Sequence, residues 1–383
     1  MSLAVTRLFA SVTALVLGAS LLGASTLTSS PPAGAAAPVV TTVASGLSLP
    51  WDVTWVGNVM LFNERPGRLW SLRPGGTPQR VTVPLPRLWT ASEAGLLGMV
   101  AHPAAATNGL FYTCMSVAKG TGPGDVQVWQ WRLKSPTEAV KVKVILTGIP
   151  SNKGRHNGCR LRFRASDLLY IGTGDAAQGT AAQNLKSLGG KVLRVHADGR
   201  IPSSNPFSSK GGKARYVWSY GHRNVQGLAF RSTSSQLWSV EHGPDRDDEV
   251  NRVIRGGNYG WSPTPGYNES VPMTDLNRFP KAVRAKWRSG KPTVATSGAT
   301  FLSGGQWGTW NGRLAVAMLK SQGIRLFTVG RGDKVTEAAI IATGYGRIRT
   351  VQQGPDSALY FTTSNATVKE PAVDKVYRLT LAG

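Results

Sequence analysis

The stretch CRLRFRASDLLYIGTGD, residues 159 to 175, contains a short apolar strand candidate, a polar turn and a second strand candidate with an aliphatic pair. Short runs of this kind, bounded by Gly, Asp or Ser, are typical of β-strands. Helical periodicity is rare along the rest of the chain, which contains 45 Gly and 23 Pro among 383 residues. The sequence therefore predicts an all-β fold.

The same pattern of two strand candidates separated by a polar turn occurs six times. The segments that contain it include NVMLFNERPGRLWSL, VQGLAFRSTSSQLWSVEHG and IRTVQQGPDSALYFTTS. One marker residue in each second strand gives separations of 49, 58, 68, 77 and 45 residues; the markers are Phe62, Phe111, Leu169, Leu237, Leu314 and Leu359. Six units of roughly blade size predict a six-bladed β-propeller. A pair of β-sandwiches is the alternative, but it does not explain six repeats of one pattern.

The two ends of the predicted propeller contain further strand candidates. VVTTVASGLSL begins at Val39, and DKVYRLTLAG begins at Asp374. These segments are expected to share one blade and to close the ring.

Residues 1–37 have the composition of a secretory signal: Arg7, an apolar run, then small residues with a cleavage site expected near Ala35 to Ala37. An uncleaved anchor is the alternative, although Ser and Gly interrupt the short apolar run. We expect an exported protein, secreted or periplasmic, whose propeller domain spans residues 38–383.

The chain has a formal net charge of +24, and cleavage of the predicted signal would remove only Arg7, which leaves +23. This charge favours association with polyanions. The basic residues are spread along the sequence, so no specific nucleic-acid partner is expected. Loose attachment to an anionic cell envelope is the milder expectation.

The two cysteines, Cys114 and Cys159, match no CxxC metal or redox motif. An even pair in an oxidising compartment predicts a structural disulfide. The sequence also contains no CxxCH motif, which excludes a fused c-type cytochrome.

Five of the 20 acidic residues fall within nine positions: Glu241, Asp245, Asp247, Asp248 and Glu249. One interpretation is a solvated acidic turn. The other is a cation site, because hard cations such as calcium prefer several oxygen ligands.

Five segments together resemble the soluble glucose/sorbosone dehydrogenase family, the PQQ-dependent aldose sugar dehydrogenases: EAGLLGMVAHP, RHNGCRLRF, YGHRNVQGLAF, EHGPDRDDEVNRVIRGGNYGW and GRIRTVQQGPDSALYFTT. The resemblance extends from Leu47 to Leu379. It implies a PQQ- and calcium-dependent oxidoreductase that converts aldose sugars at C1 to lactones and passes electrons to an external acceptor.

The resemblance implies that His156 is the base that takes the proton of the anomeric hydroxyl, a role that suits the neutral pKa of histidine. Glu93 stands where the family has a residue that touches the sugar. Arg155 and Cys159 differ from the residues that the family usually has beside this histidine, and Val225 stands where the family usually has a proline. Arg155 is expected to crowd the pocket and to change substrate preference.

PQQ carries three carboxylates, for which arginine supplies planar, multidentate donors. The resemblance implies that Arg223, Asn224, Arg347 and Arg349 bind it, with the last two on one face of a strand. Lys320 matches a cofactor-contacting lysine more loosely.

The acidic segment resembles the calcium loop of the family. The resemblance implies that main-chain oxygens of Gly243 and Pro244 hold a calcium ion that bridges to PQQ. It also implies that Glu249 and the position of Tyr259 hold a second calcium ion. Calcium beside the quinone would act as a Lewis acid.

Two other functions compete with this interpretation. A non-catalytic exported propeller that binds glycans or anionic envelope polymers would use the positive charge. A metal-dependent lactone hydrolase ranks last, because such a site takes carboxylates from several blades and these acids lie on one loop.

Overall fold

The computed structural model describes residues 37–164, 167–366 and 372–382. The predicted signal lies almost wholly outside the described residues. In these ranges the chain forms 24 strands in six four-stranded sheets, and all the neighbouring strands of each sheet run antiparallel.

Five sheets each use four strands that follow one another in the chain. The first sheet contains β2 (Pro50–Val56), β3 (Val59–Glu64), β4 (Arg68–Leu72) and β5 (Gln79–Arg80). The second contains β6 (Leu96–Ala101), β7 (Leu110–Lys119), β8 (Gly122–Ser135) and β9 (Glu138–Pro150). The third contains β10 (Arg160–Phe163), β11 (Leu168–Gly172), β12 (Lys191–His196) and β13 (Val217–Tyr220). The fourth and fifth contain β14 (Val225–Phe230), β15 (Leu237–Glu241), β16 (Glu249–Val253), β17 (Trp287–Arg288), and β18 (Thr296–Phe301), β19 (Leu314–Met318), β20 (Ile324–Val329), β21 (Val335–Ile341).

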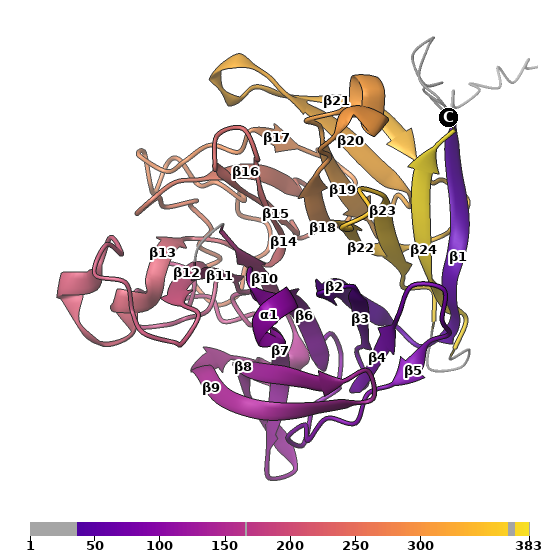
Figure 1. Ribbon diagram of the computed structural model, residues 1–383. Helices are drawn as coiled ribbons and strands as arrows, with labels where there is room; N and C mark the ends of the chain where they lie inside the picture. Colours follow the sequence, from indigo (N-terminus) through magenta and orange to yellow (C-terminus); the bar gives the residue numbers. More distant parts are fainter. Residues whose placement is uncertain (1–36, 165–166, 367–371, 383) are drawn as a thin grey trace, which may run out of the picture. The chain divides into compact units, whose positions relative to one another are not determined.

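The sixth sheet joins the two ends of the sequence. Its order is β22 (Ile348–Gln353), β23 (Leu359–Thr363), β24 (Asp374–Leu381) and β1 (Pro38–Leu47). Strand β1 pairs with β24 from Pro38 opposite Leu381 to Leu47 opposite Asp374, and the two lie side by side in Figure 1. The prediction that the end segments share a closing blade is confirmed.

The first strands of the six sheets contact one another in sequence, β2 with β6, β6 with β10, β10 with β14, β14 with β18 and β18 with β22, and β22 returns to β2. The sheets therefore surround a common axis as the blades of a six-bladed propeller (Figure 1). This confirms the fold predicted from the repeated pattern.

Apolar side chains between neighbouring blades form the core. Leu97, Leu161, Ile171 and Leu193 are fully buried in a cluster that joins the second and third blades, together with Cys114 and Cys159. These two cysteines form the predicted disulfide, with an S–S distance of 2.08 Å. The bridge ties β7 to the residue that precedes β10.

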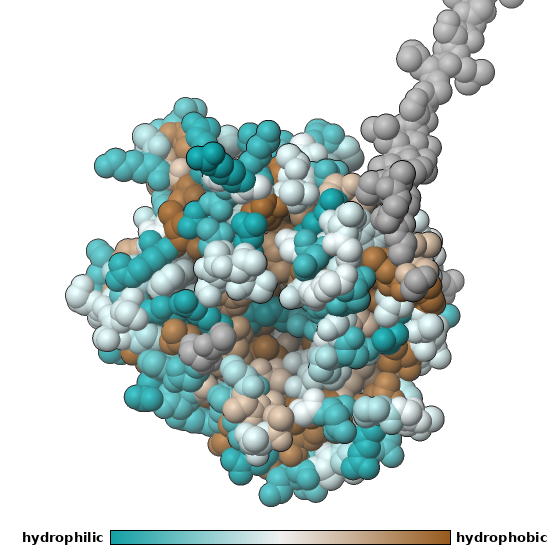
Figure 2. All heavy atoms as spheres, turned by 45° about the horizontal axis from the view of Figure 1, so that its top comes forward, coloured by the Kyte–Doolittle hydropathy of each residue, from teal (hydrophilic) through white to brown (hydrophobic). Residues whose placement is uncertain are grey.

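Helices are short in the described ranges. They comprise α1 (Ala105–Asn108) and five 3₁₀ turns: η1 (Asn152–Gly154), η2 (Ser208–Lys210), η3 (Gly212–Tyr216), η4 (Gly305–Trp310) and η5 (Arg331–Asp333). No described helix has the length and apolar character needed to cross a membrane. Hydrophilic residues cover most of the surface in Figure 2, and that face is hollowed near its middle.

Antiparallel order determines which loops meet. The loop between the second and third strands of a blade lies at the same end as the loop that leads to the next blade. Loops of these two kinds carry Glu93, His156, Arg223, Lys320 and Arg347. The fold therefore brings residues from five blades to one mouth of the ring.

Candidate active site

His156 lies in the loop between β9 and β10, and Asp175 lies in the loop between β11 and β12. Their side chains are 5% and 0% exposed, and His156 Nδ1 is 2.9 Å from Asp175 Oδ1. A carboxylate only accepts hydrogen bonds, so Nδ1 carries the proton and Nε2 keeps its lone pair. The pair holds the imidazole in the tautomer that a general base requires.

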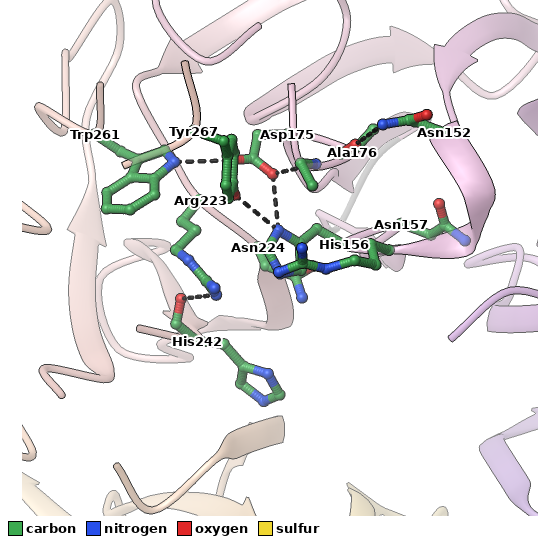
Figure 3. Close-up of polar contacts among 12 residues, drawn as sticks. Asn152, His156, Asn157, Asp175, Ala176, Arg223, Asn224, His242, Trp261 and Tyr267 are labelled. Atoms are coloured by element: carbon green, nitrogen blue, oxygen red, sulfur yellow. Dashed lines mark hydrogen bonds and ion pairs between the residues drawn. The ribbon is translucent and has the colours of Figure 1, made fainter. Parts of the chain in front are cut away.

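Asp175 is itself fixed by three further donors (Figure 3). Trp261 Nε1 and the Tyr267 hydroxyl each donate to Oδ2 at 2.7 Å, and the Ala177 amide donates to Oδ1 at 2.8 Å. The Tyr267 oxygen is also 3.0 Å from His156 Nδ1. Burial, followed by the charge of Asp175, raises the pKa of Tyr267, so its hydroxyl stays protonated.

The backbone around His156 is strained. Its φ of 49° lies in the left-handed region, which non-glycine residues rarely adopt. A Cβ at Gly174 would lie 1.8 Å from the His156 carbonyl oxygen, so only glycine fits there. The His156 amide donates to Glu93 Oε2 at 3.1 Å. These contacts fix His156 from several loops at once.

Arg223 and Asn224 lie in the loop that enters β14. The Arg223 side chain is 5% exposed, pairs with Glu269 and donates from NH1 to the His242 carbonyl at 3.2 Å. Its Nε has no hydrogen-bond partner among the described residues. Asn224 Oδ1 accepts a hydrogen bond from the Gly158 amide at 3.1 Å, which joins this loop to the loop of His156.

Arg349 on β22 donates from NH1 to Gln226 Oε1 at 3.0 Å. Burial, partly offset by Glu93, lowers the pKa of Arg349 to about 9. Arg347 directly precedes β22, and its carbonyl accepts the Ser364 amide at 2.8 Å. Arg347 is exposed before the strand, where Nε donates to the Ser364 carbonyl at 3.1 Å. The exposed Lys320 lies beyond β19, with Nζ 3.4 Å from Thr293 Oγ1.

His242 is the uncharged member of this group. Burial, followed by the charges of Arg349 and Arg223, lowers the pKa of His242 to about 3. Its Nε2 has no hydrogen-bond partner within the described ranges. A neutral imidazole between two arginines can donate or accept one further hydrogen bond.

The acidic segment is not a simple solvated turn. Asp248 is buried and accepts the amides of Gly243 at 2.8 Å, Val294 at 2.7 Å and Ala295 at 2.6 Å. Asp248 therefore shapes the loop that carries Gly243 and Pro244. Asp245 is exposed and pairs with basic neighbours.

Glu249 is buried opposite Glu241 in the pairing of β15 with β16. Burial, followed by the charge of Glu241, raises the pKa of Glu249 to about 8. Asn251 and Thr274 donate to its two oxygens at 3.1 Å. The hydroxyl of Tyr259 donates instead to the Arg252 carbonyl at 2.5 Å. Among the described residues, no three His, Cys, Asp or Glu side chains form a metal-binding group.

Sequence reasoning missed Asp175, Trp261, Tyr267 and Glu269. The run GTGD, which follows a predicted strand, was a usable signal for Asp175. Tyr267 and Glu269 lie in the long connection between β16 and β17. Nothing in their local sequence indicates that Tyr267 contacts His156 and Asp175 or that Glu269 pairs with Arg223 and Arg155.

The donor set fits an anionic, planar cofactor such as PQQ. Arg223 is buried and Arg349 is half-buried. Arg347 and Lys320 lie in loops at the same mouth of the ring, and His242 can supply a neutral hydrogen-bond donor. The unpartnered Nε of Arg223 and Nε2 of His242 are the polar atoms that a bound ligand would satisfy.

A family model described as glucose/sorbosone dehydrogenase matches residues 47–370. An aldose sugar dehydrogenase of Escherichia coli is 32% identical over 332 residues, which cover 84% of this chain and 88% of the relative.

Two solved structures are similar in fold. The soluble aldose sugar dehydrogenase of Escherichia coli in its apo form gives a TM-score of 0.81 at 29% identity, and covers 90% of this chain and 100% of that chain. The PQQ-bound form of an aldose sugar dehydrogenase from Streptomyces coelicolor gives a TM-score of 0.73 at 27% identity. The match covers 92% of this chain and 100% of that chain.

Proposed function

We propose that this chain, which belongs to the glucose/sorbosone dehydrogenase family, is a PQQ- and calcium-dependent enzyme that oxidises aldose sugars at C1 to lactones. The observation that carries the proposal is the pair His156–Asp175, which lies beside the loop of Arg223 and Asn224. A base with a fixed tautomer beside a cluster of arginines suits proton abstraction coupled to electron transfer.

His156 would take the proton of the anomeric hydroxyl on Nε2 while C1 loses a hydride. Asp175 accepts the hydrogen bond of the Nδ1–H group throughout and would stabilise the imidazolium that forms. Trp261 and Tyr267 keep Asp175 in place. Glu93 contacts the His156 amide, so its carboxylate lies where it can also contact a sugar hydroxyl.

Arg223, Asn224, Arg347, Arg349 and Lys320 would hold PQQ. When bound, PQQ supplies the two-electron acceptor, and the electrons then pass to an external acceptor. Carbonyl oxygens of Gly243 and Pro244 are the proposed ligands of a calcium ion beside it.

Glu249 and the Tyr259 position are the proposed site of a second, structural calcium ion. A nearby cation would favour the charged form of Glu249, which burial and Glu241 disfavour. We further propose export, cleavage near Ala35 to Ala37 and loose association with an anionic envelope, on the grounds of the N-terminal sequence and the charge.

The test is reconstitution of purified protein with PQQ and calcium, followed by reduction of an artificial dye with a panel of aldoses. Dye reduction that requires both additives and disappears in His156→Ala would support the proposal. Absence of PQQ absorbance after gel filtration would refute it. That result would favour the alternative, a non-catalytic propeller that binds glycans or anionic polymers.

A further inference from the structure

We propose that the preferred sugar carries an anionic group, a carboxylate or a phosphate, and that Arg155 binds this group. The inference rests on the proposed function, because it assigns the substrate class of the same site. It makes Arg155 a specificity-determining residue of the reaction.

Arg155 follows η1 and directly precedes the base. Its side chain is 49% exposed, whereas that of His156 is 5% exposed. The arginine therefore lies at the mouth of the site, and the histidine lies at its floor. The residue next to the buried histidine is therefore a solvent-accessible cation.

The guanidinium of Arg155 has free donors. Its ion-pair partner is Glu269, at 3.6 Å, and no side-chain hydrogen bond of Arg155 is found among the described residues. Glu269 forms its short hydrogen bond with Arg223 instead. A half-exposed pair at this distance contributes little to stability, so Arg155 can bind an incoming anion without breaking a strong contact.

The position of Arg155 is nevertheless defined. Its guanidinium carbon lies 5.8 Å from the centroid of the Tyr267 ring, within the range of a cation–π contact. The Tyr267 hydroxyl is bound to Asp175 at 2.7 Å. The aromatic ring that supports Arg155 is thus fixed by the same carboxylate that orients the base.

Arg155 is a cation beyond those assigned to the cofactor, and Glu269 and Glu93 are the carboxylates beside it and beside His156. Arg223, Arg347, Arg349 and Lys320 are the candidate partners of the cofactor carboxylates. A planar guanidinium binds carboxylates and phosphates in a bidentate manner. A neutral aldose would leave this capacity unused.

The experiment compares the reconstituted wild type with Arg155→Gln, Arg155→Lys and Arg331→Gln. Arg331 is exposed in η5, at the opposite end of its blade, and its replacement removes the same charge away from the site. The substrates are glucose, glucuronate and glucose 6-phosphate. Each loses a hydride from C1 to the cofactor and the hydroxyl proton to His156, so the reaction is the same for all three.

We expect kcat/KM for the preferred anionic sugar, relative to glucose, to fall roughly 10- to 100-fold in R155Q, the loss of one charge-assisted pair. The loss should appear mainly in KM. R155K should recover part of it, and R331Q should match the wild type. The anionic substrate whose rate depends on Arg155 identifies the group as carboxylate or phosphate.

A second measurement is independent of turnover. Methyl glucuronide and methyl glucoside have a blocked anomeric hydroxyl, and their binding is measured by calorimetry. Weaker binding of the glucuronide alone in R155Q supports the inference even if no aldose is oxidised, an outcome that defeats only the proposed function. An unchanged ratio of anionic to neutral sugar in both rates and binding, in folded R155Q, would overturn it.

Discussion

Replacement of Asp175 by Asn should abolish most of the catalytic rate while leaving cofactor binding intact. The Asp175 carboxylate accepts four hydrogen bonds, at 2.7 to 2.9 Å, from His156, Trp261, Tyr267 and Ala177. An amide of the same shape has one accepting oxygen and one donating nitrogen. If its NH2 group faces His156, Nδ1 must become the acceptor and the proton moves to Nε2, so the base loses its lone pair toward the substrate.

The magnitude follows from these contacts. General base catalysis contributes roughly 10²- to 10⁴-fold, or about 3 to 5 kcal/mol of the barrier, and kcat should fall within that range. Loss of two hydrogen bonds to a charged acceptor should lower the free energy of unfolding by roughly 3 kcal/mol. Dye-reduction kinetics measure the first effect and urea unfolding measures the second.

Asp374→Asn is the matched control. Asp374 is also buried and accepts bonds from Thr363 at 2.8 Å and from the amides of Leu49, Asn365 and Ala366. It contacts neither the base nor a cofactor candidate, so D374N should lose stability and keep kcat. A folded D175N enzyme that binds PQQ and turns over at the wild-type rate would refute the assignment of Asp175.

Arg349→Met should weaken PQQ binding roughly 30- to 100-fold, as absorbance titration would show, because one charged hydrogen-bonding group is lost; unchanged affinity would remove Arg349 from the cofactor site. Replacement of both Cys114 and Cys159 by Ser should lower stability by about 4 kcal/mol for their 45-residue separation, and dithiothreitol should then have no further effect. Chelation of calcium should lower the melting temperature of the wild type, and less so that of Glu249→Gln, in calorimetric scans. Burial lowers the pKa of Lys191 to about 7, below its value of roughly 10 in the unfolded chain. The free energy of unfolding should therefore rise with pH between about 7 and 10, because over this range the unfolded chain binds the proton that the folded chain has lost. Urea unfolding of the wild type and of Lys191→Met should show this rise in the wild type alone, and parallel pH profiles would contradict it.

The propeller was predictable because its signal repeats. Each blade contributes its own strand pair, so an error in one segment leaves the other five repeats intact. The closing blade was predictable for a related reason, since Val39 and Asp374 begin the two strand candidates that had no other partner. The disulfide of Cys114 followed from there being one possible pairing.

The site was predictable where residues sit next to a strand and not where long loops cross the ring. His156 and Arg223 were assigned from the resemblance to the family, and both lie in loops that lead into the first strand of a blade. Tyr267 and Glu269 lie far along the connection between β16 and β17. The sequence of such a long loop has no hydrophobic periodicity from which its path across the ring could be predicted.

The closing blade has a consequence for how the protein is made. Its strand β1 leaves the ribosome at the start of synthesis, whereas β22 to β24 leave it at the end. The ring cannot be completed on a partial translation product, and the loops that form the mouth cannot reach their final places before the last strand arrives. Truncated chains should therefore lack the assembled site altogether, and the adjacent ends of β1 and β24 make the fold a natural candidate for circular permutation.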